Sequence, residues 1–199
     1  MHKVIVRARL PLWYTEGFNP KPKMIFAVPI CFCLESVCEF VDIRLTERME
    51  PSEVVKRLNE NMTDEMQATE AYYPETKFTD LKWLSYTIII NTVGADTALA
   101  EKCNDALKTE KLEVLKNTKS GEAVVDIRPL VKSADAVFSD GEIRIACILS
   151  ADPSSFLNPE YVVKILREKC GILNCENLYK EGYSIMRERA YDENMQEFR

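Results

Sequence analysis

The residues best suited to bind a ligand lie in the short stretch GFNPKPK, residues 17–23. Lys21 and Lys23 are two positions apart, so in an extended segment both ammonium groups project to one side and can face an anion together. Gly17 permits backbone angles that other residues avoid, and Asn19 precedes a proline and favours a turn. The second proline keeps the chain extended. The sequence therefore predicts a stiff, anion-facing loop.

Aromatic residues surround this loop. Trp13 and Tyr14 precede it and Phe18 lies within it, so each could offer a stacking face to a nucleobase or another planar group. The alternative is a proline-stiffened connector with two solvated lysines and aromatic rings that pack inward. The sequence leaves both interpretations open.

Two further pairs of polar residues are candidates for binding. Glu35 and Ser36 follow the first expected strand in a turn. Asp126 and Arg128 lie in VVDIRP, where alternation places them on one face of a strand and could let them bind an anion or order a base. The alternative for this pair is an ordinary, weakly stabilising ion pair on an exposed sheet face.

The cysteines do not predict a metal site or an iron–sulfur cluster. Of the seven, three form the spacing Cys-x-Cys-x4-Cys at Cys31, Cys33 and Cys38, which is not the paired-ligand spacing of structural zinc. The others mostly lie in apolar runs, as buried thiols do in reducing compartments, and the single His2 is terminal. We expect no disulfide framework, no metal and no cofactor.

Composition restricts the class of protein. The 199 residues are 46% hydrophobic and can bury a core, but no window is long and apolar enough to span a membrane. The N-terminus does not have the pattern of a signal peptide, so a cytoplasmic protein is expected. The net charge of −6 would repel a polyanion from most of the surface, so any contact with nucleic acid must be local. The sequence also contains no phosphate-binding glycine loop, nucleophile elbow or dinucleotide fingerprint.

The pattern of apolar residues predicts an α+β fold. A first series is expected to contain the end of a helix at 1–9, strands at 24–30 and 38–45, a helix from Pro51 and a strand at 66–73. A second series is expected to contain strands at 85–92, 111–116, 123–131, 134–138, 142–150 and 172–183, with helices starting near Asp96 and Asn158. The segment RERAYDENMQEFR, residues 187–199, is expected to be a solvated helix end or frayed tail.

These two series predict two ferredoxin-like lobes of strand-helix-strand-strand-helix-strand order. Residues 1–76 would form the first lobe, which lacks its opening strand. Residues 77–199 would form the second, with an extra hairpin and a charged C-terminal tail. The helices should be buried against the sheets through Val54, Val55 and Leu58 in the first lobe and through Leu99, Cys103, Val162 and Leu166 in the second.

Several segments carry a resemblance to a known family. They are LPLWYTEGFNPKPKMIFAVPI, LESVCEFVDIRL, VVDIRPLV and IRIACILSADPSSFLNPEYVVKIL. The chain resembles an uncharacterised bacterial family of radical-SAM-linked proteins, found alone or fused behind cobalamin-binding radical SAM domains. Members of that family usually have an upstream strand and a Ser-His-Leu-Asp-type helix start, a histidine where this chain has Lys21, and a glycine where it has Cys33.

Two functions are consistent with these observations. The resemblance implies a noncatalytic recognition or accessory module that presents RNA or another anionic substrate to a radical SAM partner through the basic and aromatic loop. The alternative is an RNA-modifying enzyme in which a single carboxylate, Asp126 or Asp42, acts as nucleophile or base in a cleft between the lobes. We expect the first.

Overall fold

The computed structural model describes residues 1–118, 121–175 and 180–199. They form two compact units, of which the first contains residues 1–29 and 39–77 together with Arg199. The second contains residues 30–38 and 78–198. The units are therefore not contiguous in sequence, because the segment 30–38 belongs to the second. The division into lobes of residues 1–76 and 77–199 stays a prediction.

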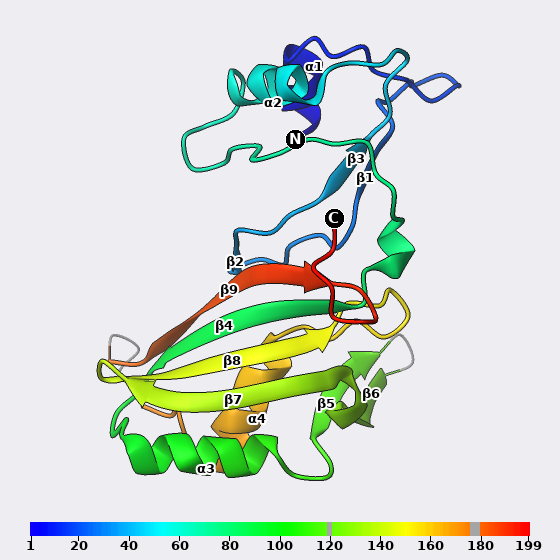
Figure 1. Cartoon of the computed structure of the whole chain (residues 1–199). Coiled ribbons are helices and arrows are strands. Elements are labelled where there is room, and N and C mark those ends of the chain that lie inside the picture. The colour runs from blue at the N-terminus through cyan, green and yellow to red at the C-terminus, as the bar shows by residue number, and fades with distance from the viewer. Residues whose placement is uncertain (119–120, 176–179) are drawn as a thin grey trace. The chain divides into compact units, whose positions relative to one another are not determined.

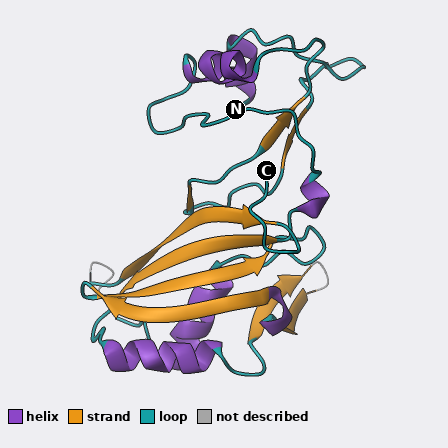
Figure 2. Ribbon diagram, in the orientation of Figure 1, coloured by secondary structure: helices purple, strands orange, loops and turns teal. Residues whose placement is uncertain are grey.

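Figures 1 and 2 show the helices and strands of the chain. The first unit contains α1 (His2–Arg7), β1 (Met24–Phe26), β3 (Val41–Ile43) and α2 (Pro51–Asn59). The second contains β2 (Glu35–Ser36), η1 (Phe78–Asp80), β4 (Trp83–Asn91), α3 (Thr97–Leu107), β5 (Glu113–Thr118), β6 (Gly121–Asp126), η2 (Arg128–Leu130), β7 (Val131–Ser139), β8 (Glu142–Ser150), α4 (Glu160–Cys170) and β9 (Gly182–Tyr191). The described chain is thus a mixed α+β protein.

The second unit is built on a five-stranded sheet of order β2-β9-β4-β8-β7. Its strands are antiparallel except that β2 is parallel to β9. Apart from β2 and the separate β5–β6 hairpin, the elements follow the expected strand-helix-strand-strand-helix-strand order, and α3 and α4 lie on one face of the sheet (Figure 1). Alternation in β4 buries Leu84, Tyr86, Ile88 and Ile90 toward the core.

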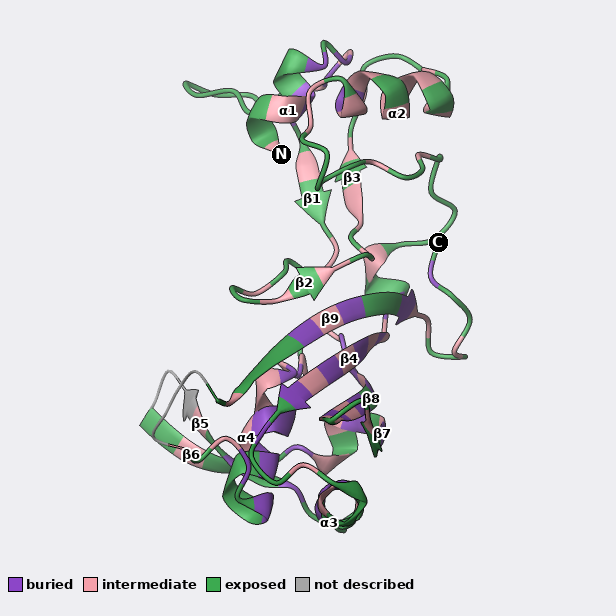
Figure 3. Ribbon diagram, turned by 90° about the vertical axis from the view of Figure 1, so that its left-hand side faces the viewer, coloured by how far each residue is buried: buried purple, intermediate pink, exposed green. Residues whose placement is uncertain are grey.

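Both helices of this unit begin or end as the sequence predicts. The side chain of Asp96 caps α3 by accepting a hydrogen bond from the amide of Leu99 at 2.7 Å. Gly171 ends α4 with a left-handed φ of 75°. The predicted inner residues Cys103, Val162 and Leu166 are buried, whereas Leu99 is half-buried. Figure 3 shows buried residues along the strands β4 and β9.

The first unit has a smaller core. Its buried residues are Ile5, Ala8, Leu10, Leu12 and Leu58, from the two helices and the segment after α1. Val54, Met24 and Ile43 pack against this cluster and are half-buried. The β1–β3 sheet has only two strands, with Met24 opposite Ile43. Leu58 and Val54 of α2 therefore share a core with Met24 and Ile43 of the two strands and with the segment after α1, and Val55 is half-buried.

The predicted strand at residues 66–73 is wrong, because these residues lie in no strand. The side chain of Asn59 makes the two hydrogen bonds that a neighbouring strand would make with the backbone of Ala68. Its Oδ1 accepts a hydrogen bond from the Ala68 amide at 2.7 Å, and its Nδ2 donates to the Ala68 carbonyl at 2.9 Å. The first unit consequently lacks a third strand, and the expected pair of ferredoxin-like lobes is not confirmed.

Asn104 of α3 makes the same contact in the second unit. Its Oδ1 accepts from the Ala136 amide and its Nδ2 donates to the Ala136 carbonyl, both at 2.7 Å. Ala136 lies in the middle of β7, which is one of the two edge strands of the sheet. The amide of Asn104 thus satisfies backbone groups that an unpaired edge would otherwise offer to another chain.

The last strand lies later in the chain than predicted. Residues 172–175 are irregular, residues 176–179 of the expected strand lie outside the described residues, and β9 continues to Tyr191. It lies between β2 and β4 and is not an edge strand. The prediction of a solvated tail from residue 187 is also wrong, since Arg187 and Ala190 are buried. Alternation of charged and apolar residues here marks a strand, not a frayed end.

We predict that the variant Asn104→Asp is less stable by about 1–3 kcal/mol, because it removes the donor to the Ala136 carbonyl and places a charge beside a half-buried strand. Urea unfolding of the purified protein measures the difference. The variant Asn91→Asp makes the same chemical change at an exposed strand end and should shift stability by less than about 0.5 kcal/mol. Equal effects of the two variants would contradict the proposed role of Asn104.

A second stability prediction concerns Glu181, which accepts hydrogen bonds from the Thr92 hydroxyl, the Cys175 amide and the Val93 amide. These bonds, first that of Thr92, lower the pKa of Glu181 below its ordinary value of 4.5. Its stabilising effect is therefore present above pH 4.5 and is lost as the pH falls through the lowered pKa. In urea unfolding, Glu181→Gln should be less stable at pH 7 and should lose less stability on acidification to pH 3, whereas exposed Glu110→Gln should follow the wild type.

Candidate functional site

Three extended segments of the first unit meet at Trp13, Lys23 and Arg44. The amide of Trp13 donates to the carbonyl of Arg44 at 2.9 Å, and the amide of Arg44 donates to the carbonyl of Lys23 at 3.1 Å. The amide of Lys23 donates to the carbonyl of Trp13 at 3.0 Å, which closes a ring of three hydrogen bonds. The ring fixes these three residues beside one another.

The side chains of the three residues lie on one face, which we call the cationic face. Met24, Ile43 and Leu12 pack in or against the core, and they neighbour Lys23, Arg44 and Trp13 in sequence. Because successive side chains of extended segments point to opposite sides, the three neighbours point away from the core. The guanidinium of Arg44 lies 4.5 Å from the centroid of the Trp13 ring, as a cation–π contact requires.

The loop that the sequence singled out is a hairpin that extends this face. Tyr14 pairs with Pro22, and beyond this pair the amide of Thr15 donates to the carbonyl of Lys21 at 2.9 Å. The amide of Lys21 in turn donates to the Thr15 hydroxyl oxygen at 3.1 Å. Since Lys21 and Lys23 are two residues apart in an extended strand, alternation places Lys21 on the cationic face.

The tip of the hairpin is exposed. Gly17 has a φ of 118°, which explains the glycine at this position. Asn19 is exposed, and the Phe18 side chain is as accessible as in an extended peptide. Tyr14 is also exposed, at 44%. The rings of Phe18 and Tyr14 therefore do not pack inward, whereas Trp13 is half-buried.

Charge favours anions at this face but not over the rest of the protein. The first unit contains equal numbers of basic and acidic residues, so the net charge of −6 resides in the second unit. Lys21, Lys23 and Arg44 are all exposed. Among residues 1–118, 121–175 and 180–199, no carboxylate forms an ion pair with any of these three cations. Their charges are thus available to a ligand.

The other predicted site residues lie in the second unit and are largely used by the fold. Glu35 and Ser36 form β2, not a turn, and the Ser36 hydroxyl oxygen accepts from the amide of Cys38 at 3.2 Å. The Asp126 carboxylate accepts from the amides of Arg128 and Leu112, both at 2.9 Å. These bonds, first that of Arg128, lower the pKa of Asp126.

Arg128 does not share a strand face with Asp126. The strand β6 ends at Asp126, and Arg128 begins the 3₁₀ turn η2. The Arg128 amide donates to the Asp126 side chain, and the proline that follows has no amide hydrogen to donate to a sheet, so the strand does not continue. The alternation used to predict a same-face pair therefore does not apply here.

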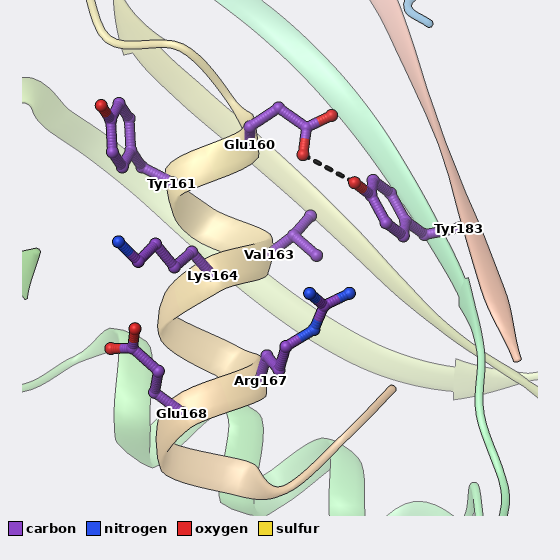
Figure 4. A pocket seen from close by; sticks show the side chains of 7 residues that line it. All are labelled: Glu160, Tyr161, Val163, Lys164, Arg167, Glu168 and Tyr183. Carbon is purple, nitrogen blue, oxygen red and sulfur yellow. Dashed lines mark hydrogen bonds between the residues drawn. The ribbon is translucent and has the colours of Figure 1, made fainter. Parts of the chain in front are cut away.

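A shallow hollow of about 350 Å³ lies along α4 (Figure 4). The Tyr183 hydroxyl donates to Oε2 of Glu160 at 2.7 Å, and the Arg167 side chain points toward Tyr183. Lys164 and Glu168 also line it. The hollow is lined by two basic and two acidic residues, and the Glu160 carboxylate already accepts the hydrogen bond from Tyr183. The charge of the hollow therefore does not favour an anion.

The described residues contain no group of three or more His, Cys, Asp or Glu side chains placed to hold a metal ion. Cys103, Cys147 and Cys170 are buried free thiols, and Cys33 is exposed with a left-handed φ of 63°. None of the helices in the described ranges is long and apolar enough to cross a membrane.

The sequence interpretation missed Arg44. Its signal was available in FVDIRL, where apolar and charged residues alternate and place Asp42 and Arg44 on one side. The ring that joins Arg44 to Trp13 connects residues 31 positions apart, and local patterns do not reveal such a contact.

Fold and site together define a mixed α+β protein with a cationic, aromatic face on its smaller unit. Residues 1–159 match the model of a family described as an uncharacterized protein conserved in bacteria (DUF2344), and the chain belongs to this family. No curated protein and no solved structure matches the chain.

We predict that the purified chain holds less than about 0.1 zinc or iron atom per molecule, because the cysteines that are not buried lack the paired spacing of metal ligands. Elemental analysis after expression in metal-supplemented medium tests this. A content near one atom per chain that falls when Cys31, Cys33 or Cys38 is changed to Ser would contradict it.

Proposed function

We propose that this protein is a noncatalytic recognition module that binds a short segment of single-stranded RNA on the cationic face. The observation that carries the proposal is the row of Trp13, Lys23 and Arg44, fixed by its ring of hydrogen bonds and extended by Lys21. Proteins bind single-stranded nucleic acid by combining cations that contact phosphates with aromatic rings on which bases stack. This face supplies both within one rigid group of segments.

The proposed contacts divide between phosphates and bases. Lys21 and Lys23 are exposed ammonium groups and supply phosphate contacts that do not depend on base sequence. Exposed Phe18 supplies a stacking surface at the tip of the hairpin, whereas Tyr14, opposite Pro22, lies on the other side of the hairpin from the two lysines. Arg44 is already stacked on Trp13, so its planar guanidinium is held in one orientation toward a ligand.

The proposal also includes a partner enzyme that acts on the bound RNA. The resemblance to radical-SAM-linked proteins supports a module that presents RNA to a radical SAM enzyme. The engagement of the Asp126 carboxylate in two backbone hydrogen bonds supports recognition over catalysis at that residue, since a base or nucleophile needs a free carboxylate.

We predict that Lys21→Gln/Lys23→Gln weakens RNA binding far more than folding. The change removes two exposed charges and no apolar contact, so the free energy of unfolding should change by well under about 1 kcal/mol. For single-stranded RNA, each lost phosphate contact should reduce the slope of log affinity against log salt concentration by about 0.7. Fluorescence anisotropy with a labelled ten-nucleotide RNA of mixed sequence, over a salt series, measures the slope.

The matched control is Lys3→Gln/Lys56→Gln, which removes two exposed lysines of the same unit from the helices α1 and α2. Its salt slope should equal that of the wild type. Equal slopes for all three proteins, or the absence of RNA binding by the wild type at low salt, would refute the proposal.

A further inference from the structure

Asp42 is a carboxylate on the cationic face. It precedes Ile43, which packs against the core, and it is two residues from Arg44, so alternation places Asp42 and Arg44 on the same side. Two residues of a strand span about 7 Å, which is close to the separation of neighbouring nucleotides in an extended single strand. Asp42 therefore lies within one nucleotide of the proposed phosphate contacts.

The Asp42 carboxylate is not neutralised by the cations of this face. It forms no hydrogen bond or ion pair with any residue that the structure describes. The residue directly opposite on β1 is Ile25, whose side chain is 47% exposed. Partial burial raises the pKa of Asp42, and no cation compensates for this loss of solvation.

An unpaired carboxylate beside phosphate-binding lysines lowers the affinity for any polyanion. It favours binding only if it accepts hydrogen bonds from the ligand. In single-stranded RNA the donors are the ribose 2′-hydroxyls, which every nucleotide carries, and the edges of unstacked bases, which differ between nucleotides. Only the base edges can therefore give a carboxylate a preference for one nucleotide. The exposed side chain of Ile25 offers an apolar surface on which such a base can lie next to the carboxylate.

The geometry points to guanine as the base that Asp42 reads, an inference that rests on the proposed RNA-binding function. An ionised carboxylate has two acceptor oxygens, and only guanine presents two adjacent donors, N1–H and N2–H, on its Watson–Crick edge. Adenine and cytosine place a ring nitrogen acceptor beside their amino group, and uracil flanks its single donor with two carbonyls. A carboxylate repels each of those acceptors, so Asp42 acts as a specificity residue.

The test uses the full chain and labelled ten-nucleotide RNAs that are all uridine except for one central base. Fluorescence anisotropy should show that guanine at this position binds about tenfold more tightly than adenine or uracil. Inosine lacks the N2 amino group and keeps N1–H, so it should lose most of this preference. The inosine comparison needs no protein variant and is independent of any effect on folding.

Asp42→Asn should abolish the preference for guanine and bind the adenine RNA at least as tightly as the wild type does, because a repulsive charge is gone. Asp64→Asn removes an exposed carboxylate of the same unit and should keep the preference. A wild type that binds all the RNAs equally, or an Asp42→Asn variant that still prefers guanine, would overturn the inference and leave the RNA-binding proposal intact. A wild type that binds none of them would overturn both.

Discussion

The ring of hydrogen bonds at Trp13, Lys23 and Arg44 is the constraint on which the candidate site depends. A two-stranded ribbon such as β1–β3 is marginally stable alone, because little apolar surface covers its backbone hydrogen bonds. A third segment at Trp13 closes the ribbon, and each of the three residues then donates and accepts one backbone bond. The side chains that leave this ring cannot separate without breaking it. Rigid placement reduces the entropy that a ligand must overcome to order them.

Elsewhere in the chain, asparagine side chains satisfy the backbone groups of extended segments. Asn59 in α2 and Asn104 in α3 each bind both backbone groups of one alanine in an extended segment. Asn104 is four residues after buried Ala100 and three before buried Leu107, and Asn59 is four residues after half-buried Val55, so each amide lies on a helix face that packs inward. The two units therefore use one local arrangement, in which a helix is fixed to an extended segment by a side-chain amide. Only in the second unit does that segment join a sheet.

The sequence predicted those parts of the fold that depend on local patterns. The strand at Glu142–Ser150, the proline-initiated α2 and the Asp96 cap follow from periodicity and capping residues within a few positions. The strand expected at residues 66–73 failed because the backbone partner of Ala68 is a side chain, which no propensity describes. The strand β9 was misplaced because charged residues alternate with buried ones there, and Arg187 is itself buried.

The candidate site could likewise be predicted only where it depends on residues close together in sequence. The stiff hairpin and its lysines could be predicted, since glycine and proline act on their immediate neighbours. The contribution of Arg44 and the position of Asp42 beside it could not, because both depend on a contact between segments distant in sequence. Asp126 and Arg128 were wrongly predicted to share a strand face, because strand alternation was assumed to continue past the end of β6.

The acidic composition of the chain is compatible with an anion site because charges act over short distances in solution. At physiological ionic strength the Debye length is about 8 Å, so exposed acids farther away than this are largely screened from a ligand. Neighbouring residues across or along a pair of strands are closer than that, and Lys21, Lys23 and Arg44 consequently act together. Asp42 lies inside the same range, so a ligand on this face must accommodate its charge. A site of this kind, with three cations on adjoining extended segments, binds a short segment of an anionic ligand.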